Sequence, residues 1–169
     1  ILLNFQMFSA YALDGFANAA EALTGEAVGA KNRSRFRAAV KATSLWALVF
    51  SACFTLVYLA LGTVFVDILT GVLEVRETSR QYLLWAQLLP LVSVWSFQLD
   101  GIFIGSTWTA EMRNGMAASL AVFIAVLFVT VPGMGNHGLW FAFVLFMATR
   151  GLTLAAFYSR LEKTVGGKA

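Results

Sequence analysis

Residues 43–66 read TSLWALVFSACFTLVYLALGTVFV, a stretch without one acidic or basic side chain. About 20 apolar residues in a row are long enough to cross the hydrocarbon core of a bilayer as a helix. Hydrophobic side chains do not alternate with polar ones here, as they would in the strands of a membrane β-barrel. Because every backbone N–H and C=O needs a partner inside lipid, the stretch predicts a membrane-spanning α-helix.

The composition of the whole chain also indicates a membrane protein. Of its 169 residues, 59% are hydrophobic and 12% are charged, whereas soluble domains carry roughly 45–50% apolar and about 25% charged residues. The basic residues mostly flank apolar stretches, which argues against nucleic-acid binding. The single cysteine, Cys53, allows neither a disulfide within the chain nor a metal cluster of cysteines.

Four further apolar stretches accompany the first, and together they predict an all-α transmembrane fold, a bundle of five membrane-spanning helices. Pro90 interrupts the third stretch, and its missing N–H predicts a helix kink there. The chain begins without Met or a charged leader, so we interpret it as a piece cut from a longer protein. The predicted spans cover residues 1–30, 43–66, 82–108, 115–131 and 138–158.

The basic residues predict how this bundle lies in the membrane. Nine of them fall in or near the first and third links and the C-terminal tail, which five antiparallel spans would place on one side. Two fall in the second link, on the other side. Cytoplasmic loops are enriched in Lys and Arg, so the first side, including the C-terminus, is predicted to be cytoplasmic. The nine are Lys31, Arg33, Arg35, Arg37, Lys41, Arg113, Arg160, Lys163 and Lys168, and the two are Arg76 and Arg80.

Polar side chains gather on one face of the first span. At 100° per residue they lie within an arc of about 100°. A charge at mid-membrane costs about 2.5–3.5 kcal/mol, so we expect this face to meet protein or water rather than lipid. Asp14, Asn18 and Glu21 are candidates for binding substrate or a cation; the alternative is a polar clamp between helices, or, for Glu21, a position near the cytoplasmic end. The face comprises Asn4, Tyr11, Asp14, Asn18, Glu21 and Gly25.

Two ionisable residues of later spans extend this set. Asp100 is a further candidate for substrate or cation binding, and a structural clamp is equally open to it. Arg150 lies well inside the fifth span, where it either reaches towards the cytoplasm or forms a structural ion pair with one of the acids. His137, in the glycine-rich link before the fifth span, is interpreted as a solvated residue. No residue set typical of an enzyme is present, so we expect no catalytic residue, metal site or organic cofactor.

Two stretches carry a resemblance to a known family. Residues 11–25 read YALDGFANAAEALTG and are followed by VGAKNR at 28–33, while residues 98–105 read QLDGIFIG and are followed by TWT at 107–109 and EMRN at 111–114. With the spacing of the spans, these residues resemble the DinF-type branch of the multidrug and toxic compound extrusion (MATE) family over the whole chain. Such proteins have twelve helices in two six-helix lobes, which alternate between outward-open and inward-open states.

The resemblance implies that residues 1–169 are a fragment of the C-terminal lobe, with helices eight to twelve. Its partners would be the N-terminal lobe of the same transporter, small organic substrates and the lipid bilayer of a bacterial inner (plasma) membrane. The implied function is antiport of organic, cationic or amphipathic compounds against protons or sodium ions. A lipid or envelope-precursor flippase of related architecture is the alternative. In the proton-coupled branch of the family much of the coupling chemistry is assigned to acids of the other lobe, so the roles given to Asp14 and Asp100 rest on these residues and not on the resemblance.

Overall fold

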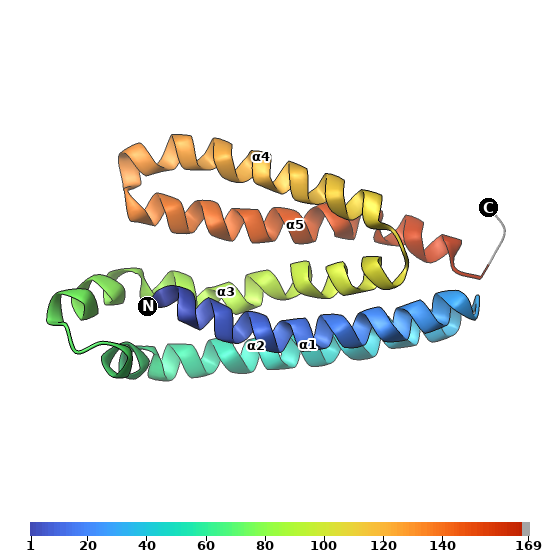
Figure 1. Ribbon diagram of the computed structural model, residues 1–169, viewed down its shortest axis with the longest axis horizontal. Coiled ribbons are helices and arrows are strands. Elements are labelled where there is room, and N and C mark those ends of the chain that lie inside the picture. Colours follow the sequence, from blue (N-terminus) through green and yellow to red (C-terminus); the bar gives the residue numbers. More distant parts are fainter. Residues whose placement is uncertain (167–169) are drawn as a thin grey trace.

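The computed structural model describes residues 1–166 as five long helices joined by short connections (Figure 1). Consecutive helices run in opposite directions. The N-terminus and the α2–α3 and α4–α5 connections therefore share one end of the bundle, and the α1–α2 and α3–α4 connections share the other. The all-α transmembrane fold expected from the sequence is confirmed. The helices are α1 (Leu2–Gly29), α2 (Arg33–Leu69), α3 (Leu73–Gly105), α4 (Thr109–Met134) and α5 (Asn136–Thr164).

Four of these helices, α2 to α5, are long and apolar enough to cross a membrane. α1 is not among them, because acidic and amide side chains interrupt its apolar residues. With 28 residues and a rise of 1.5 Å per residue, α1 is nevertheless about 42 Å long. It packs along α3 and so traverses the same thickness as the apolar helices.

The helices α2 to α5 extend beyond one or both ends of the apolar stretches that predicted them, whereas α1 lies within residues 1–30 and α3 ends at Gly105 rather than at residue 108. α2 begins at Arg33 rather than at residue 43, and α3 at Leu73 rather than at residue 82. Charged residues expected in the links therefore form the first turns of helices. The Asn32 side chain caps α2 by accepting a hydrogen bond of 3.0 Å from the Arg35 N–H. α4 continues past Pro132 to Met134, and Lys168 lies outside the described residues.

α1, α2 and α3 pack against one another, α5 packs on α3, and α4 lies mainly against α5 (Figure 1). Glycines bring α1 and α3 close together. A Cβ atom at Gly101 would collide with the backbone carbonyl of Ala17, and one at Gly105 with that of Glu21. Small residues at such crossings are typical of membrane helices, where close backbone packing replaces the hydrophobic effect.

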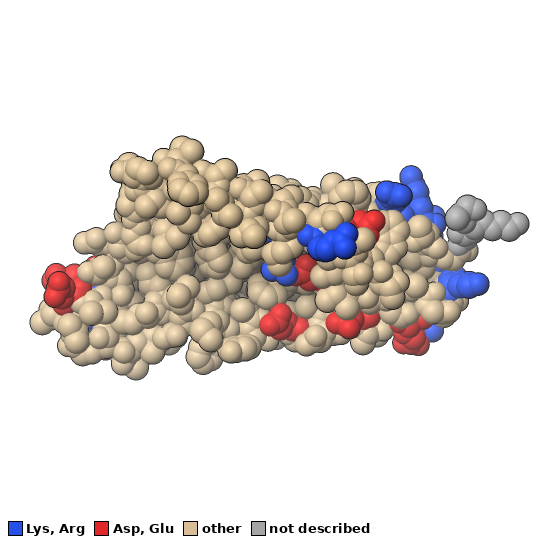
Figure 2. Space-filling model, turned by 45° about the horizontal axis from the view of Figure 1, so that its top comes forward, with Lys and Arg blue, Asp and Glu red and all other residues tan. Residues whose placement is uncertain are grey.

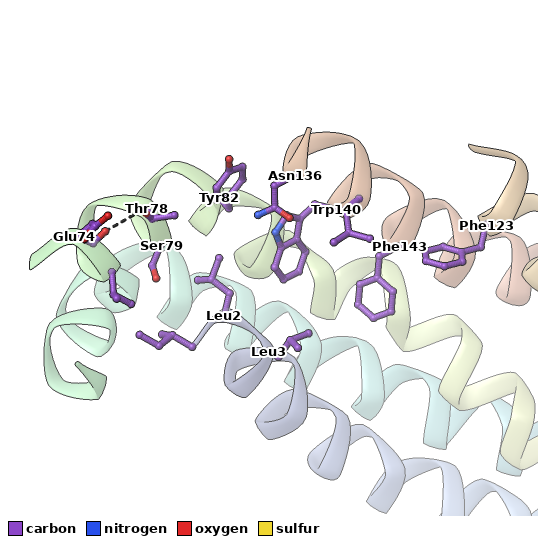
Figure 3. Close-up of a pocket in the computed structure, with 13 residues that line it drawn as sticks. Leu2, Leu3, Glu74, Thr78, Ser79, Tyr82, Phe123, Asn136, Trp140 and Phe143 are labelled. Atoms are coloured by element: carbon purple, nitrogen blue, oxygen red, sulfur yellow. Dashed lines mark hydrogen bonds between the residues drawn. The ribbon is translucent and has the colours of Figure 1, made fainter. Parts of the chain in front are cut away.

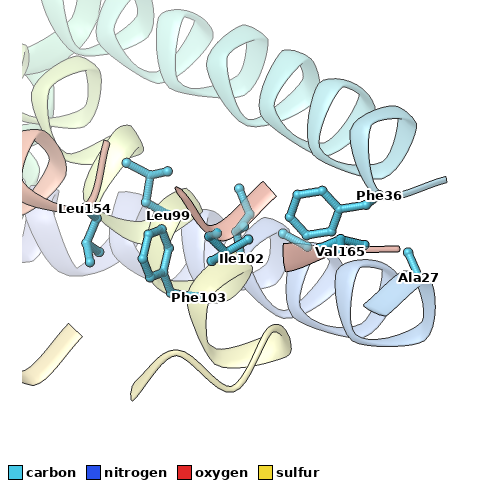
Figure 4. Packing of buried hydrophobic residues seen from close by; sticks show 9 residues of the cluster. Ala27, Phe36, Leu99, Ile102, Phe103, Leu154 and Val165 are labelled. Carbon is cyan, nitrogen blue, oxygen red and sulfur yellow. The ribbon is translucent and has the colours of Figure 1, made fainter. Parts of the chain in front are cut away.

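The largest apolar cluster joins α1, α2, α3 and α5 near the end that holds the α1–α2 connection (Figure 4). Phe36 and Phe103 are both completely buried in it. Asp100 lies between Leu99 and Ile102 of this cluster, and Arg150 lies one turn before Leu154. The packing of the cluster therefore holds α3 and α5 in the register that brings Asp100 to Arg150. Its members are Ala20, Ala27, Phe36, Leu99, Ile102, Phe103, Leu154, Leu161 and Val165.

Candidate functional site

A groove runs along α3 between α1 and α5. Both helices pack against α3, but within residues 1–166 they do not pack against each other. Figure 2 shows a hollow surface between the helices α1 to α3 and the pair α4 and α5. Charged groups lie over one half of the molecule, and the surface of the other half is largely uncharged. The groove is therefore polar in one half and apolar in the other.

Asp100 and Arg150 form an ion pair between α3 and α5. Nη2 of Arg150 donates a hydrogen bond to Oδ2 of Asp100. The Asp100 side chain is 13% exposed and that of Arg150 is 21% exposed, so the pair is largely withdrawn from solvent. Each charge compensates the other, which is how ionisable groups persist within membrane-spanning segments. Of the two alternatives for Arg150, the structure thus shows pairing with an acid.

The acidic face of α1 lies beside this pair. Ala17 of α1 packs against Gly101, the residue after Asp100, so Asp14, one turn before Ala17, lies near the level of Asp100. Asp14 and Asn18 are exposed and Glu21 is half-buried, and the three side chains make no hydrogen bond or ion pair with the described residues. α1 turns its other face, which includes Leu13 and Ala17, towards the bundle. The structure therefore brings Asp14 towards Asp100 and leaves Asn18 and Glu21 without a local partner.

At the far end of this face Gly25 packs against Gly105 of α3, whereas Asp14 and Asn18 are exposed within residues 1–166. Contact with water, or with another part of a longer protein, remains a prediction.

The apolar half of the groove widens into a pocket of about 740 Å³ near the N-terminus. Figure 3 shows Tyr82 of α3, Phe123 of α4, and Trp140 and Phe143 of α5 around it, with Glu74 at its edge. Glu74 is the one charged residue among those that line it, while Asp14, Asp100 and Arg150 lie elsewhere in the groove. The pocket suits an apolar or aromatic group, and the charged half of the groove suits a cation.

His137 makes contacts that the sequence did not predict. It lies in the first turn of α5 and is exposed, but its Nδ1 accepts a hydrogen bond of 3.0 Å from Nε1 of Trp85. Its ring centroid is 4.6 Å from that of Tyr82. Tyr82 and Trp85 are three residues apart and share a face of α3, but nothing in a single sequence links that face to a residue so far along the chain.

Two further expectations concern Pro90 and metal binding. Pro90 lies inside α3, which remains helical on both sides of it, and the kink stays a prediction. Among residues 1–166 no group of three His, Cys, Asp or Glu side chains is placed to hold a metal ion.

Comparison with known proteins gives one family. The sequence model of the MatE family matches residues 1–132. A curated protein of Escherichia coli (strain K12), "DNA damage-inducible protein F", is 44% identical over 164 residues, which cover 95% of this chain. The chain spans 35% of the length of that relative. No solved structure matches this chain.

Proposed function

The chain belongs to the MatE family of transporters, and from this membership we propose that it forms the C-terminal part of a secondary antiporter. The complete transporter would export organic, cationic or amphipathic compounds in exchange for protons or sodium ions. Its partner is an N-terminal lobe of the same protein, against which this lobe rocks to open the groove to either side. We place it in a bacterial inner membrane, with the C-terminus in the cytoplasm.

The observation that carries this proposal is the ion pair of Asp100 and Arg150 beside the groove. A carboxylate within a membrane-spanning helix is a candidate for ion or substrate binding because keeping it there is costly. Here the carboxylate has an internal cation as its partner. A proton, a sodium ion or a cationic substrate must therefore compete with the Arg150 guanidinium for Asp100.

This competition provides two states of one site. When a cation or proton occupies Asp100, the Arg150 side chain is released; when the cation leaves, the pair forms again. Asp14 adds negative charge at the edge of the same groove and so favours entry of cations over anions. An antiporter needs such an alternation, because the carboxylate must not be left without a cationic partner when the empty site returns across the membrane. Asn18 and Glu21 extend the polar face along α1 and line the same route.

Amide substitutions in the complete transporter test the proposal. We expect Asp100→Asn to reduce efflux of a fluorescent organic cation by at least about tenfold, since the loss of a charged hydrogen bond to the ligand, about 1.5–3 kcal/mol, corresponds to that factor or more. Asp14→Asn removes negative charge at the edge of the groove and should also reduce efflux more than the control does. Asp67→Asn is the matched control: Asp67 is also paired with an arginine, Arg80, at 2.7 Å, but at the end of α2 outside the groove. Efflux is measured in energised cells with equal membrane expression of every variant.

A double substitution separates transport from a structural clamp. Asp100→Asn with Arg150→Gln removes both charges and leaves neither side chain as an unpaired ion. If the pair only holds α3 to α5, the double variant transports as well as the wild type, and our site assignment is wrong. If Asp100 binds the ligand, transport stays low although the protein is stably expressed.

A further inference from the structure

A layer of polar side chains lies between two apolar clusters inside the unit formed by α1, α2 and α3. One cluster, towards the N-terminal end, includes Phe5, Tyr58 and Leu89. The other consists of Leu13, Ala47 and Val94. On each helix the residues between these clusters include polar side chains or a helix-breaking proline. We name as the polar layer Gln6 and Ser9 of α1, Ser51 and Thr55 of α2, and Pro90 and Ser93 of α3.

Two hydrogen bonds next to the polar layer give the register of the three helices. The Tyr58 hydroxyl donates to the Phe5 carbonyl at 2.9 Å, and Nε2 of Gln87 donates to the Tyr58 carbonyl at 2.8 Å. Residues 5, 58 and 87 are therefore level with each other. α2 runs antiparallel to α1 and α3. One helical turn further into the bundle, the residues at a common level are therefore Ser9 of α1, Thr55 of α2 and Pro90 of α3.

Three side-chain oxygen atoms in the polar layer have no hydrogen-bond partner among the described residues. They are Oε1 of Gln6, Oγ of Ser51 and Oγ1 of Thr55, and these residues are 7%, 0% and 3% exposed. Pro90 has no N–H, so the carbonyl of Ala86 also lacks its usual helical donor. Buried polar groups in proteins are almost always hydrogen-bonded, to protein or to water.

We propose that the polar layer is a binding site for water, which bridges α1, α2 and α3. A buried water makes about three hydrogen bonds, and the layer offers both kinds of partner. Water donates to Oε1 of Gln6 and to the Ala86 carbonyl, and it accepts from the hydroxyl groups of Ser51 and Thr55. The three helices are thus joined by water at the point where Pro90 interrupts the backbone ladder of α3.

The chemistry of the layer selects water over a metal cation. All its oxygen atoms are neutral, and no carboxylate belongs to it; the acid of α1 closest in sequence, Asp14, lies on the exposed face of that helix. A bare cation would remain uncompensated in an apolar surrounding, which is far more costly than a neutral ligand.

Radiolytic footprinting of the complete transporter in lipid nanodiscs tests for bound water. X-ray radiolysis makes hydroxyl radicals from water and oxidises side chains beside it, even where bulk solvent does not reach. Leu13, 1% exposed, borders the polar layer, and Leu154, also 1% exposed, lies in the apolar cluster of Figure 4. We expect oxidation of Leu13 to be several-fold faster than that of Leu154. Equal rates would show that the layer is dry.

A thermal-stability measurement provides an independent test. If water satisfies the Thr55 hydroxyl, Thr55→Val removes a bond of that water and lowers the Tm of the transporter; if the hydroxyl is unsatisfied, the same change raises the Tm and overturns the proposal. Ser119→Ala is the reference for loss of a buried hydroxyl bonded to protein, since Ser119 donates to the Gly115 carbonyl at 2.7 Å. Any difference in Tm between sodium and choline chloride that arises elsewhere in the transporter should persist in Thr55→Val. A higher Tm in sodium that Thr55→Val abolishes would mean a cation site instead.

Discussion

Single charged residues in this bundle differ in whether the chain itself compensates them. Asp100 has Arg150 as its partner, whereas Asp14 has none among residues 1–166. Sequence reasoning identified both carboxylates, because a charge inside an apolar stretch is costly wherever it points. It could not choose the partner of Arg150, because a helical period orders residues within one helix and carries no information on contacts between helices fifty residues apart.

Gly101 is the residue at which a single methyl group should do most damage. Its missing Cβ lets α3 approach the backbone carbonyl of Ala17, and a side-chain atom there would overlap that oxygen. We expect Gly101→Ala to destabilise the bundle by about 1–3 kcal/mol, the usual cost of overpacking. Gly15→Ala is the control, because a Cβ atom at Gly15 would have no neighbour within 4 Å, and alanine there should be neutral or favour the helix. Thermal unfolding in detergent compares the two, and equal effects would mean that α1 and α3 can separate without cost.

At the scale of helices, hydropathy predicted that each helix exists and underestimated the lengths of α2 to α5. An apolar stretch in the sequence indicates only the part of a helix that lies in hydrocarbon. The first and last turns of the helix reach into water and carry charged residues. The start of α2 had a local signal, since Asn32 is a favoured N-cap residue. α1 shows the opposite limit: its composition is too polar for a span, yet the single polar face indicated a helix with one side against the bundle.

The first turns of α2 are tied to the end of α5 by Glu162. Arg33 donates to Oε1 of Glu162 at 2.8 Å, and Arg37 donates to the same atom at 2.6 Å. We expect Glu162→Gln to cost about 1 kcal/mol of stability, because the charged hydrogen bonds from both arginines to a side chain only 13% exposed are weakened together.

Glu26 provides a matched comparison for Glu162. It pairs with Arg35 at 2.8 Å, but both side chains are 58% exposed. Exposed pairs contribute little, so Glu26→Gln should change stability by less than about 0.5 kcal/mol. Chemical denaturation of both variants at low and high salt makes the comparison. If Glu26→Gln proves as costly as Glu162→Gln, then burial of the carboxylate is not what gives the α2–α5 contact its strength.

For the whole molecule, the fold class followed from composition, but the arrangement of the helices did not. Five antiparallel helices can be packed in several orders, and apolar faces in lipid do not specify their neighbours as they do in water. The groove exists because α1 and α5 both pack on α3 and not on each other. No pattern in the sequence expresses that arrangement: the four-residue spacing of Gly101 and Gly105 is typical of a helix-packing face but does not say which helix packs there.

The orientation of the whole bundle leads to a prediction about its two ends. Alternating helix directions place the α1–α2 and α3–α4 connections at one end, with Lys31, Arg33, Arg35 and Arg37 near it (Figures 1 and 2). At the other end Arg76 and Arg80 are both paired with Asp67, which halves their net charge. The positive-inside rule then makes the first end cytoplasmic.

Single cysteines in the complete transporter can test this orientation. Ser34, in the first turn of α2, and Asn136, at the start of α5, are both exposed and lie at opposite ends of the bundle. The native Cys53, also exposed, is first replaced by alanine. An impermeant thiol reagent added to intact cells should label Asn136→Cys and leave Ser34→Cys unlabelled until the membrane is opened. Labelling of Ser34→Cys alone in intact cells would contradict the predicted orientation. The basic end would then face outwards, against the positive-inside rule.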